Sequence, residues 1–266
     1  MKIYLSADIE GVAGSVHRDE CDHEKPDHRQ FSELMTQEVL AACEGALEAG
    51  ATEIWVKDAH YSGRNILLND FPEEVKIIRG WSGHYLSMMQ ELDQSFDAVA
   101  MIGYHSRAGQ DTNPLAHTFS SGTVASLNIN GRYASEFLAN FYAASMFRVP
   151  VVFVAGDQGL SLEIQEFNSK IHTFSTKEGV GDSVISLSPR LVQRKIQEGV
   201  KQALSQDLNS YLQSHPEHFQ IELHFKTPTR AYRAAQYPGV KTVRPQVVSF
   251  ESNDYAEILK MLLFTI

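Results

Sequence analysis

The N-terminal stretch KIYLSADIEG (residues 2–11) decides the fold, because strand-type residues lead directly into two acids. Residues 3–5 are Ile, Tyr and Leu, which favour a strand, and Asp8 and Glu10 follow with one apolar residue between them. In an extended chain, residues i and i+2 point to the same side, so both carboxylates would project together. Two like charges held this close repel, and each raises the proton affinity of the other. Such a pair needs a compensating partner.

Similar strand-like runs recur along the chain, at Ile3–Ala7, Glu53–Val56, Ala98–Ile102 and Pro150–Ala155. Segments with helical periodicity or composition cover residues 31–51, 81–94, 132–147 and 188–213. Strands that alternate with helices imply crossover connections and a mostly parallel sheet. We therefore expect an α/β fold, with a mostly parallel central sheet flanked by helices.

The last part of the chain has a different pattern. Two strand-like runs, IELHFK (221–226) and KTVRPQVVSF (241–250), precede a closing helix. Earlier, TVASLNINGRYASE (123–136) predicts an alternating strand, an Asn-Gly turn and a helix start. We expect residues 1–218 to form the main α/β metal-binding domain and residues 219–266 to form a small C-terminal α+β lobe packed on it.

Composition excludes several classes of partner. The 266-residue chain has a formal net charge of −10, so it lacks the basic field that nucleic acids and anionic membranes require. No apolar run is long enough to span a bilayer, and a strand at residue 2 leaves no room for a secretory signal. Only Cys21 and Cys43 are present, which argues against a disulfide framework. We expect a soluble, cytoplasmic protein with no nucleic-acid or membrane partner.

Two further strand ends repeat the opening pattern. IWVKDAHYSG offers Asp58 and His60, and AVAMIGYHSRAG ends in a glycine followed by His105. In open α/β sheets, ligands bind beyond the carboxyl ends of the strands, so these side chains should converge there. Carboxylates and imidazoles together suit zinc, and a dication between Asp8 and Glu10 would turn their repulsion into attraction. If one carboxylate bridges two ions, the pair can activate water and polarise a carbonyl. The alternative is that each acid caps the following helix.

Other clusters have simpler interpretations. RDECDHEKPDH (18–28) is dense in zinc-ligand residue types, but no second pair at zinc-finger spacing follows, so we expect a solvated loop. AGDQGLSLE (155–163) offers Asp157 after a strand, although its glycines lack the order of a dinucleotide-binding fingerprint. Asp58 either orients a histidine ligand or stabilises a loop.

Nine stretches give the sequence a resemblance to a known family. They are SADIEGVAG, MTQEVLAACEGALEAGATEIWVKDAH, RNILL, IIRGW, MIGYHSRAG, AHTFSSG, NINGRYASE, TKEGVGDSVISLSP and VSFESND. They span nearly the whole chain, which resembles the zinc-dependent D-aminopeptidases, self-compartmentalising peptidases whose bacterial members accompany dipeptide-transport operons. The resemblance implies a cytoplasmic homo-oligomer of stacked rings, a decamer, with two zinc ions per subunit.

The resemblance also implies roles for six residues, which are Asp8, Glu10, His60, His105, Glu136 and His117. Asp8 corresponds to the acid that bridges two zinc ions, Glu10 and His60 to further ligands of one ion, and His105 and Glu136 to those of the other. His117 falls at the position of the catalytic residue. Its alternatives are a zinc ligand or a loop histidine, and the alternative for Glu136 is an exposed first-turn acid. Tyr61 departs from the family pattern, in which glycine is expected.

The resemblance therefore implies a dinuclear zinc aminopeptidase. It would hydrolyse short peptides from the free amino end through metal-activated water and prefer D-residues, as in D-Ala-D-Ala. His117 would shuttle protons or stabilise the oxyanion. Three alternatives remain, namely an amidohydrolase for L-peptides or another small amide, a catalytically inert zinc-binding ring protein and, more distantly, a phosphoesterase.

Overall fold

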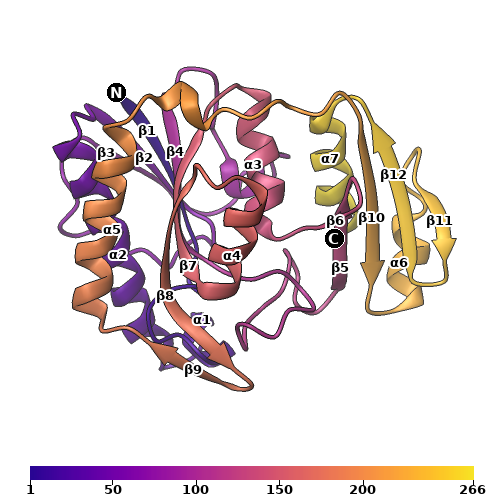
Figure 1. Cartoon of the computed structure of the whole chain (residues 1–266). Helices are drawn as coiled ribbons and strands as arrows, with labels where there is room; N and C mark the ends of the chain where they lie inside the picture. Colours follow the sequence, from indigo (N-terminus) through magenta and orange to yellow (C-terminus); the bar gives the residue numbers. More distant parts are fainter.

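The computed structural model describes residues 1–266, which form two sheets with helices around and between them (Figure 1). In spatial order, the main sheet contains β3 (Val75–Ile78), β2 (Glu53–Asp58), β1 (Lys2–Ala7), β4 (Ala98–Tyr104), β7 (Val151–Asp157), β8 (His172–Val180) and β9 (Ser183–Ser186). Every neighbouring pair is parallel except β8 and β9. The predicted α/β fold with a mostly parallel sheet is therefore confirmed.

The central strands are apolar because both of their faces are covered. Every residue of β4 and β7 is buried, and β1 is buried from Ile3 to Ala7. Continuous apolar runs are typical of parallel strands between two helical layers. These strands stabilise the sheet through burial and place its carboxyl ends, where Asp8, His60 and His105 follow, side by side.

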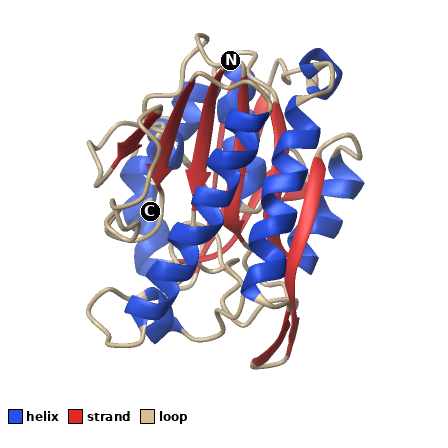
Figure 2. Ribbon diagram, turned by 90° about the vertical axis from the view of Figure 1, so that its left-hand side faces the viewer, coloured by secondary structure: helices blue, strands red, loops and turns tan.

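Helices α2 (His28–Glu48) and α5 (Pro189–Leu204) cover one face of the main sheet, as Figure 2 shows. The two helices pack closely at Gly45, where an added Cβ would lie 2.4 Å from the Gln197 carbonyl oxygen. The helix predicted within residues 31–51 is thus confirmed. The helix predicted over 188–213 ends at Leu204, and a short 3₁₀ turn, η2 (Leu208–Tyr211), follows it.

The other face packs on helices and on a second sheet. This antiparallel sheet has the order β11 (Lys241–Arg244), β12 (Val247–Ser252), β10 (Phe219–Phe225), β5 (Val124–Ile129) and β6 (Arg132–Tyr133). In Figure 1, α3 (Glu136–Met146) and α7 (Tyr255–Thr265) lie between the two sheets. One apolar cluster joins Met101 of the main sheet to Phe137 of α3 and Leu223 of β10. Each layer therefore buries its apolar side against the next.

The small sheet combines distant parts of the chain. Strands β5 and β6 come from the middle of the sequence, pair through the predicted Asn130-Gly131 turn, and join β10. Both turn residues have positive φ, which Asn and Gly tolerate best. Helix α6 (Pro228–Ala234) packs on β10 and β12. The division into residues 1–218 and 219–266 stays a prediction.

The helix predicted over residues 81–94 is wrong. Only a 3₁₀ turn, η1 (Ser87–Met89), forms there, because positive φ values at Gly83, Ser87 and Glu91 interrupt any helical run. Three further helices were not predicted, namely α1 (Arg18–Cys21), α4 (Gln158–Phe167) and α6 (Pro228–Ala234). Helix α4 begins directly after β7, and the Asp157 side chain caps it by accepting from the Leu160 N–H.

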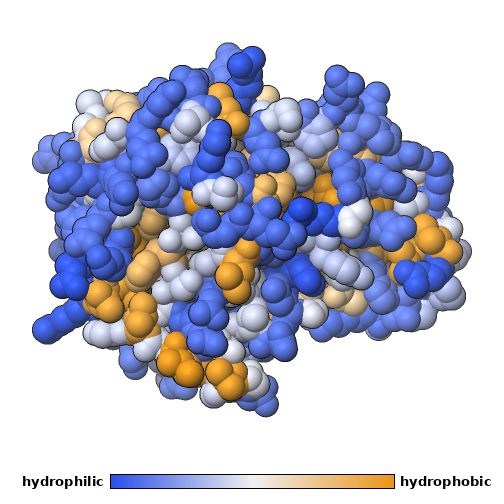
Figure 3. Space-filling model, in the orientation of Figure 1, coloured by the Kyte–Doolittle hydropathy of each residue, from blue (hydrophilic) through white to orange (hydrophobic).

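The surface is largely hydrophilic in the view of Figure 3, with apolar side chains gathered at its lower edge. The β8–β9 hairpin ends at this edge, and its Val180 and Ile185 are 52% and 65% exposed. None of the helices combines the length and the apolar character needed to cross a membrane. Exposed apolar residues on a projecting hairpin are typical of contact surfaces.

Candidate metal centre

The centre forms where β1 and β4 end against each other. The backbone N–H of Asp8 donates to the Ile102 carbonyl, and that of Gly11 donates to the Gly103 carbonyl, both at 2.8 Å. Gly103 has a φ of +70°, and a Cβ there would lie 2.2 Å from the Asp8 carbonyl oxygen. Glycine at this position therefore lets the two chain segments touch. This close approach brings Asp8 beside His105, the second residue after Gly103.

Two groups of potential ligands share Asp8. In the first, His60 Nδ1 lies 3.1 Å from Asp8 Oδ1 and 3.0 Å from Glu10 Oε2. In the second, His105 Nε2 lies 3.5 Å from Asp8 Oδ2 and 3.6 Å from Glu136 Oε2. Within each group the ligand-type atoms all lie within 4.8 Å of one another, and all five residues are buried. The two oxygens of Asp8 thus face different groups.

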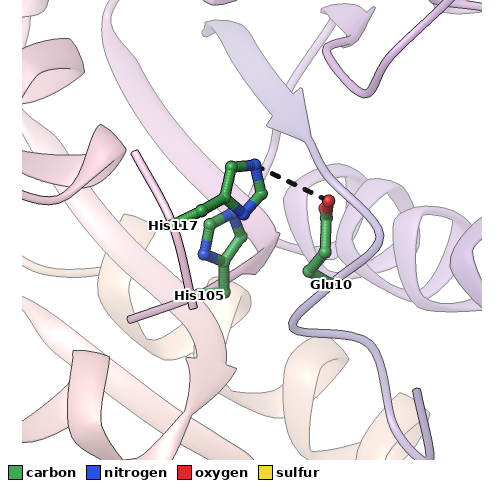
Figure 4. Close-up of side chains that lie close together, drawn as sticks. All are labelled: Glu10, His105 and His117. Atoms are coloured by element: carbon green, nitrogen blue, oxygen red, sulfur yellow. Dashed lines mark ion pairs between the residues drawn. The ribbon is translucent and has the colours of Figure 1, made fainter. Parts of the chain in front are cut away.

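His117 completes the cluster from the loop after β4. Its Nε2 lies 3.9 Å from Glu10 Oε1 and 3.7 Å from Glu136 Oε1, so it faces one carboxylate of each group. Its ring stacks on that of His105 with centroids 4.4 Å apart, and Figure 4 shows Glu10 facing the pair. Burial, together with the neighbouring His105 ring, lowers the pKa of His117. The structure therefore brings all six predicted residues together.

Backbone carbonyls orient all three imidazole rings. His60 Nε2 lies 2.7 Å from the Cys21 carbonyl oxygen, and His117 Nδ1 lies 2.9 Å from that of Leu115. His105 Nδ1 lies 2.9 Å from the Ser106 carbonyl oxygen. A carbonyl oxygen only accepts, so the nitrogen that faces it carries the proton and the other nitrogen keeps its lone pair. In the neutral rings, three lone pairs point toward the carboxylates, which is the arrangement of metal-ligating histidines.

The electrostatics of the centre favour a cation. Burial raises the pKa of Asp8 well above its usual range, and the Glu10 carboxylate adds to this effect. Burial opposes protonation of His60, but Glu10 and Asp8 outweigh it and raise the pKa of His60 well above its usual value. At His105, burial is likewise outweighed, chiefly by Glu136 and Glu10, and the pKa is raised to about 9. Three buried carboxylates thus draw positive charge into the site.

The donor set fits zinc. Glu10 Oε2 and His105 Nε2 are buried and make no hydrogen bond, so each has ligand capacity that the protein itself leaves unused. Each group offers two carboxylates and one imidazole, and oxygen and nitrogen donors of these kinds suit Zn²⁺. Glu136 is buried, so it is not the exposed first-turn acid of the alternative interpretation. Its Oε1 accepts a 2.6 Å hydrogen bond from the Phe119 backbone N–H.

A buried polar frame underneath the centre was largely missed from the sequence. The Glu10 carbonyl oxygen accepts hydrogen bonds from Lys177 Nζ at 2.5 Å and Asn113 Nδ2 at 3.1 Å. Asn113 also donates to Asp157 Oδ2, which accepts from the Ser106 backbone N–H as well. Of these residues, only Asp157 gave a signal, as an acid directly after a strand. The frame ties the turns that carry Glu10 and His105 to β7 and β8.

Asp58 and the segment 18–28 both support the centre from outside the ligand groups. Asp58 accepts hydrogen bonds from the backbone and side chain of Asn65, and Asn65 donates to the His60 carbonyl oxygen at 2.7 Å. Asp58 therefore stabilises the loop after His60 and does not contact its ring. The expectation of a solvated loop at 18–28 holds for residues 24–27, which are exposed, but is wrong for residues 18–21, which form α1, with a buried Cys21 whose carbonyl faces His60.

A cavity of about 590 Å³ opens at the centre. Among its lining residues are Asp8, Glu10, His60, His117 and Glu136. Tyr61 and Trp81 also line it, and Trp81 Nε1 donates to the Tyr61 carbonyl oxygen at 2.7 Å. Tyr61 has a φ of +45°, a conformation that favours the glycine expected at this position. The cavity has the size of a small-molecule site.

The fold and the centre define a class, namely α/β proteins whose strand ends supply a metal site suited to hydrolytic chemistry. The chain belongs to the D-aminopeptidase family, whose sequence model matches residues 1–264. Members of this family are peptide hydrolases, so the predicted family and enzyme class are confirmed.

Two comparisons describe its relatives. The D-aminopeptidase of Bacillus subtilis (strain 168) is 29% identical over 266 residues, which cover 99% of this chain and 96% of the relative. The solved structure of the Zn-dependent D-aminopeptidase DppA from Bacillus subtilis, described as a self-compartmentalizing protease, matches with a TM-score of 0.91. Sequence identity to that structure is 28%, with 99% of this chain and 96% of that chain covered.

Proposed function

We propose that this protein is a dinuclear zinc aminopeptidase that removes the first residue from short peptides. The proposal depends above all on Asp8, whose two oxygens face two separate ligand groups. Asp8, Glu10 and His60 would hold one ion, and Asp8, His105 and Glu136 would hold the other. A carboxylate bridging two cations loses the repulsion that its acidic neighbours impose. The zinc dependence of the solved relative supports the choice of metal.

The residues around the ions would divide the reaction between them. When bound, zinc supplies Lewis acidity, which polarises an amide carbonyl and acidifies water. His117 would move a proton between the attacking and leaving groups, because a carbonyl holds its Nδ1 and its Nε2 faces Glu10 and Glu136 in the wall of the cavity. The aromatic wall of Tyr61 and Trp81 would exclude water from the bound peptide.

The substrate would be a dipeptide or similarly short peptide with a free amino end and D-residues, as in D-Ala-D-Ala. The name of the family and the cavity of about 590 Å³ support this choice. Preference for L-peptides or for another small amide is the competing possibility. Stereospecificity depends on cavity shape, so paired substrates are needed to decide between the two.

The assembly would be a homo-oligomer of stacked rings, a decamer. The solved relative is described as self-compartmentalizing, and the exposed apolar tip of the β8–β9 hairpin offers a contact surface. Sedimentation analysis should give a mass of ten subunits, whereas a monomeric mass would contradict the proposal. The cytoplasmic location stays a prediction.

Metal analysis combined with hydrolysis assays tests the proposed function. The parent should contain two zinc ions per subunit and hydrolyse D-Ala-D-Ala faster than L-Ala-L-Ala. Asp8→Ala should lose both metals and activity. His117→Ala should keep zinc but lose about 10²- to 10⁴-fold in rate, the usual contribution of a general acid–base group. Glu44→Ala, an exposed change on α2, should change neither property.

Three results would contradict the proposal. Full zinc occupancy in Asp8→Ala would exclude the bridging role. Faster hydrolysis of the L,L substrate would favour the amidohydrolase for L-peptides. A zinc-loaded parent that hydrolyses no short peptide would favour the inert ring protein.

A further inference from the structure

The cavity at the centre contains one side chain with a permanent positive charge, that of Arg18. Four carboxylates, from Asp8, Glu10, Asp22 and Glu136, line the same cavity, and none forms an ion pair with Arg18. An arginine that stays unpaired among acids has its charge available for an anion that enters the cavity. Arg18 therefore differs in kind from every other lining residue.

Arg18 is positioned by segments that also build the centre. It begins α1, whose last residue, Cys21, presents its carbonyl to His60. Its Nη1 donates to Ser121 Oγ, and Ser121 lies four residues beyond His117 in the same loop. The guanidinium carries five N–H donors, and this is the single hydrogen bond that its side chain makes. An edge of the guanidinium thus remains free for a bidentate ligand.

We propose that Arg18 binds the C-terminal carboxylate of the peptide substrate, an inference that rests on the aminopeptidase function proposed above. A dipeptide whose amino end lies at the metal centre carries its carboxylate only a few bonds away, within the same cavity. Three of the four lining acids, Asp8, Glu10 and Glu136, are committed to the metal ions under the proposed function. Away from the metal centre, Arg18 is the single lining side chain with a permanent positive charge that can pair with the carboxylate. A planar guanidinium matches a carboxylate in two parallel hydrogen bonds.

The contact would make the enzyme select by peptide length. A peptide with a free carboxylate at the right distance gains the interaction with Arg18, whereas a longer or amidated peptide places a neutral group there. Selection arises because only the free carboxylate gains the charged contact, while the exposed guanidinium stays hydrated beside a neutral end group. Arg18 would therefore set the preference for very short peptides with free carboxyl ends.

The test compares acid and amide forms of one ligand on the zinc-loaded full chain. Turnover is measured with D-Ala-D-Ala and its C-terminal amide. Binding is measured by calorimetry with the analogues of both in which the peptide carbonyl is reduced to a methylene, so that no hydrolysis is needed. The variants are Arg18→Gln, Arg18→Lys and, as a matched control, Arg244→Gln, which replaces an exposed arginine on β11.

The parent should prefer the acid in both measurements. Arg18→Gln should lose about 10- to 100-fold for the acid, the loss typical of a hydrogen bond to a charged group, and stay unchanged for the amide. Arg18→Lys should keep part of the preference, because it keeps the charge without the planar fork. Arg244→Gln should behave as the parent.

Two outcomes would overturn the assignment. Arg18→Gln that keeps the preference for the acid would show that another group binds the carboxylate. An equal loss for acid and amide would show that Arg18 only supports the loop through Ser121. If the parent hydrolyses neither peptide but binds the acid analogue more tightly through Arg18, the aminopeptidase function fails and the carboxylate site stands.

Discussion

Replacing Asp157 with asparagine should loosen the second metal group without unfolding the protein. Asp157 is fully buried at the end of β7 and accepts four hydrogen bonds. The donors are the Ser106 backbone N–H at 2.7 Å, the Ser106 hydroxyl, Asn113 Nδ2 at 2.9 Å and the Leu160 backbone N–H at 2.9 Å. The amide of the variant has one oxygen in place of two. Its best arrangement turns that oxygen to Ser106 N–H and Asn113, and its NH₂ group to the Ser106 hydroxyl.

The magnitude follows from the donors that remain unpaired. In Asp157→Asn, the Leu160 N–H loses its acceptor, and one buried unpaired donor costs about 1–3 kcal/mol. In Asp157→Ala, all four donors lose this acceptor. The Ser106 hydroxyl and the Asn113 amide keep contacts with Thr112 and with the Glu10 carbonyl, but the N–H groups of Ser106 and Leu160 are left unpaired, so the cost rises to at least about 2–6 kcal/mol. Ser106 also presents its carbonyl to His105. Loss of such supporting contacts typically weakens metal affinity about 10- to 100-fold, and the effect should fall on the ion that His105 is proposed to hold.

Urea unfolding and zinc competition titrations measure the two effects. Asp254→Asn provides the matched control, because Asp254 caps α7 at the surface and accepts from the Ala256 N–H at 2.9 Å. Asparagine caps helices as well as aspartate, so this variant should stay within about 0.5 kcal/mol of the parent. The reasoning is refuted if Asp157→Asn also stays within that range and binds its second zinc ion with parental affinity.

Three other perturbations give distinct results. Burial raises the pKa of Glu38 to about 8. The unfolded chain releases this proton above about pH 4.5, whereas the folded protein keeps it until about pH 8, so stability falls as the pH rises between these values. Glu38→Gln keeps the oxygen that accepts from the Ala13 N–H and has no proton to lose. In urea unfolding, its gain in stability over the parent should grow from near zero at pH 4.5 to about 3 kcal/mol at pH 7, and a gain independent of pH would contradict this. Gly103→Ala should cost at least about 3 kcal/mol, because its Cβ would meet the Asp8 carbonyl in a left-handed backbone, whereas Gly122→Ala, with open space around it, should be neutral. Chelation of zinc should lower the melting temperature of the parent, since a ligand at 100 times its Kd contributes about 2.7 kcal/mol, but should leave that of Asp8→Ala unchanged.

The parts of the fold that could be predicted are those whose burial shows in the sequence. Strands β1, β4 and β7 are covered on both faces, so their runs are apolar throughout, and α2 carries a long apolar stripe. The prediction of a helix over residues 81–94 failed because the apolar residues of this region are buried without forming a helix. Leu86, Met88 and Met89 reach the core from a chain that turns at Gly83, Ser87 and Glu91, and Trp81 lines the cavity.

The residues of the candidate site also fall into two groups, those whose meeting the sequence predicts and those whose meeting it does not. Asp8, Glu10, His60 and His105 follow strands of one parallel sheet, so topology alone predicts that they meet. Glu136 and His117 come from a helix start and a loop whose places depend on the small sheet. No rule of strand order brings these two residues to the centre, and only the family resemblance indicated them before the structure did.

The orientation of the imidazole rings could not be predicted at all, and the reason is physical. The sequence left two roles open for Asp58, orienting a histidine ring or stabilising a loop, and the second is observed, because Asn65 and Ile66 take its oxygens. Backbone carbonyls hold all three rings instead. Every residue type has a carbonyl, so this function leaves no signal in side-chain chemistry and depends only on the path of the loops. A change that bends a loop, such as a Cβ at Gly103, should therefore turn a ligand away without touching it, whereas a change of side chain that keeps the path should leave the rings in place.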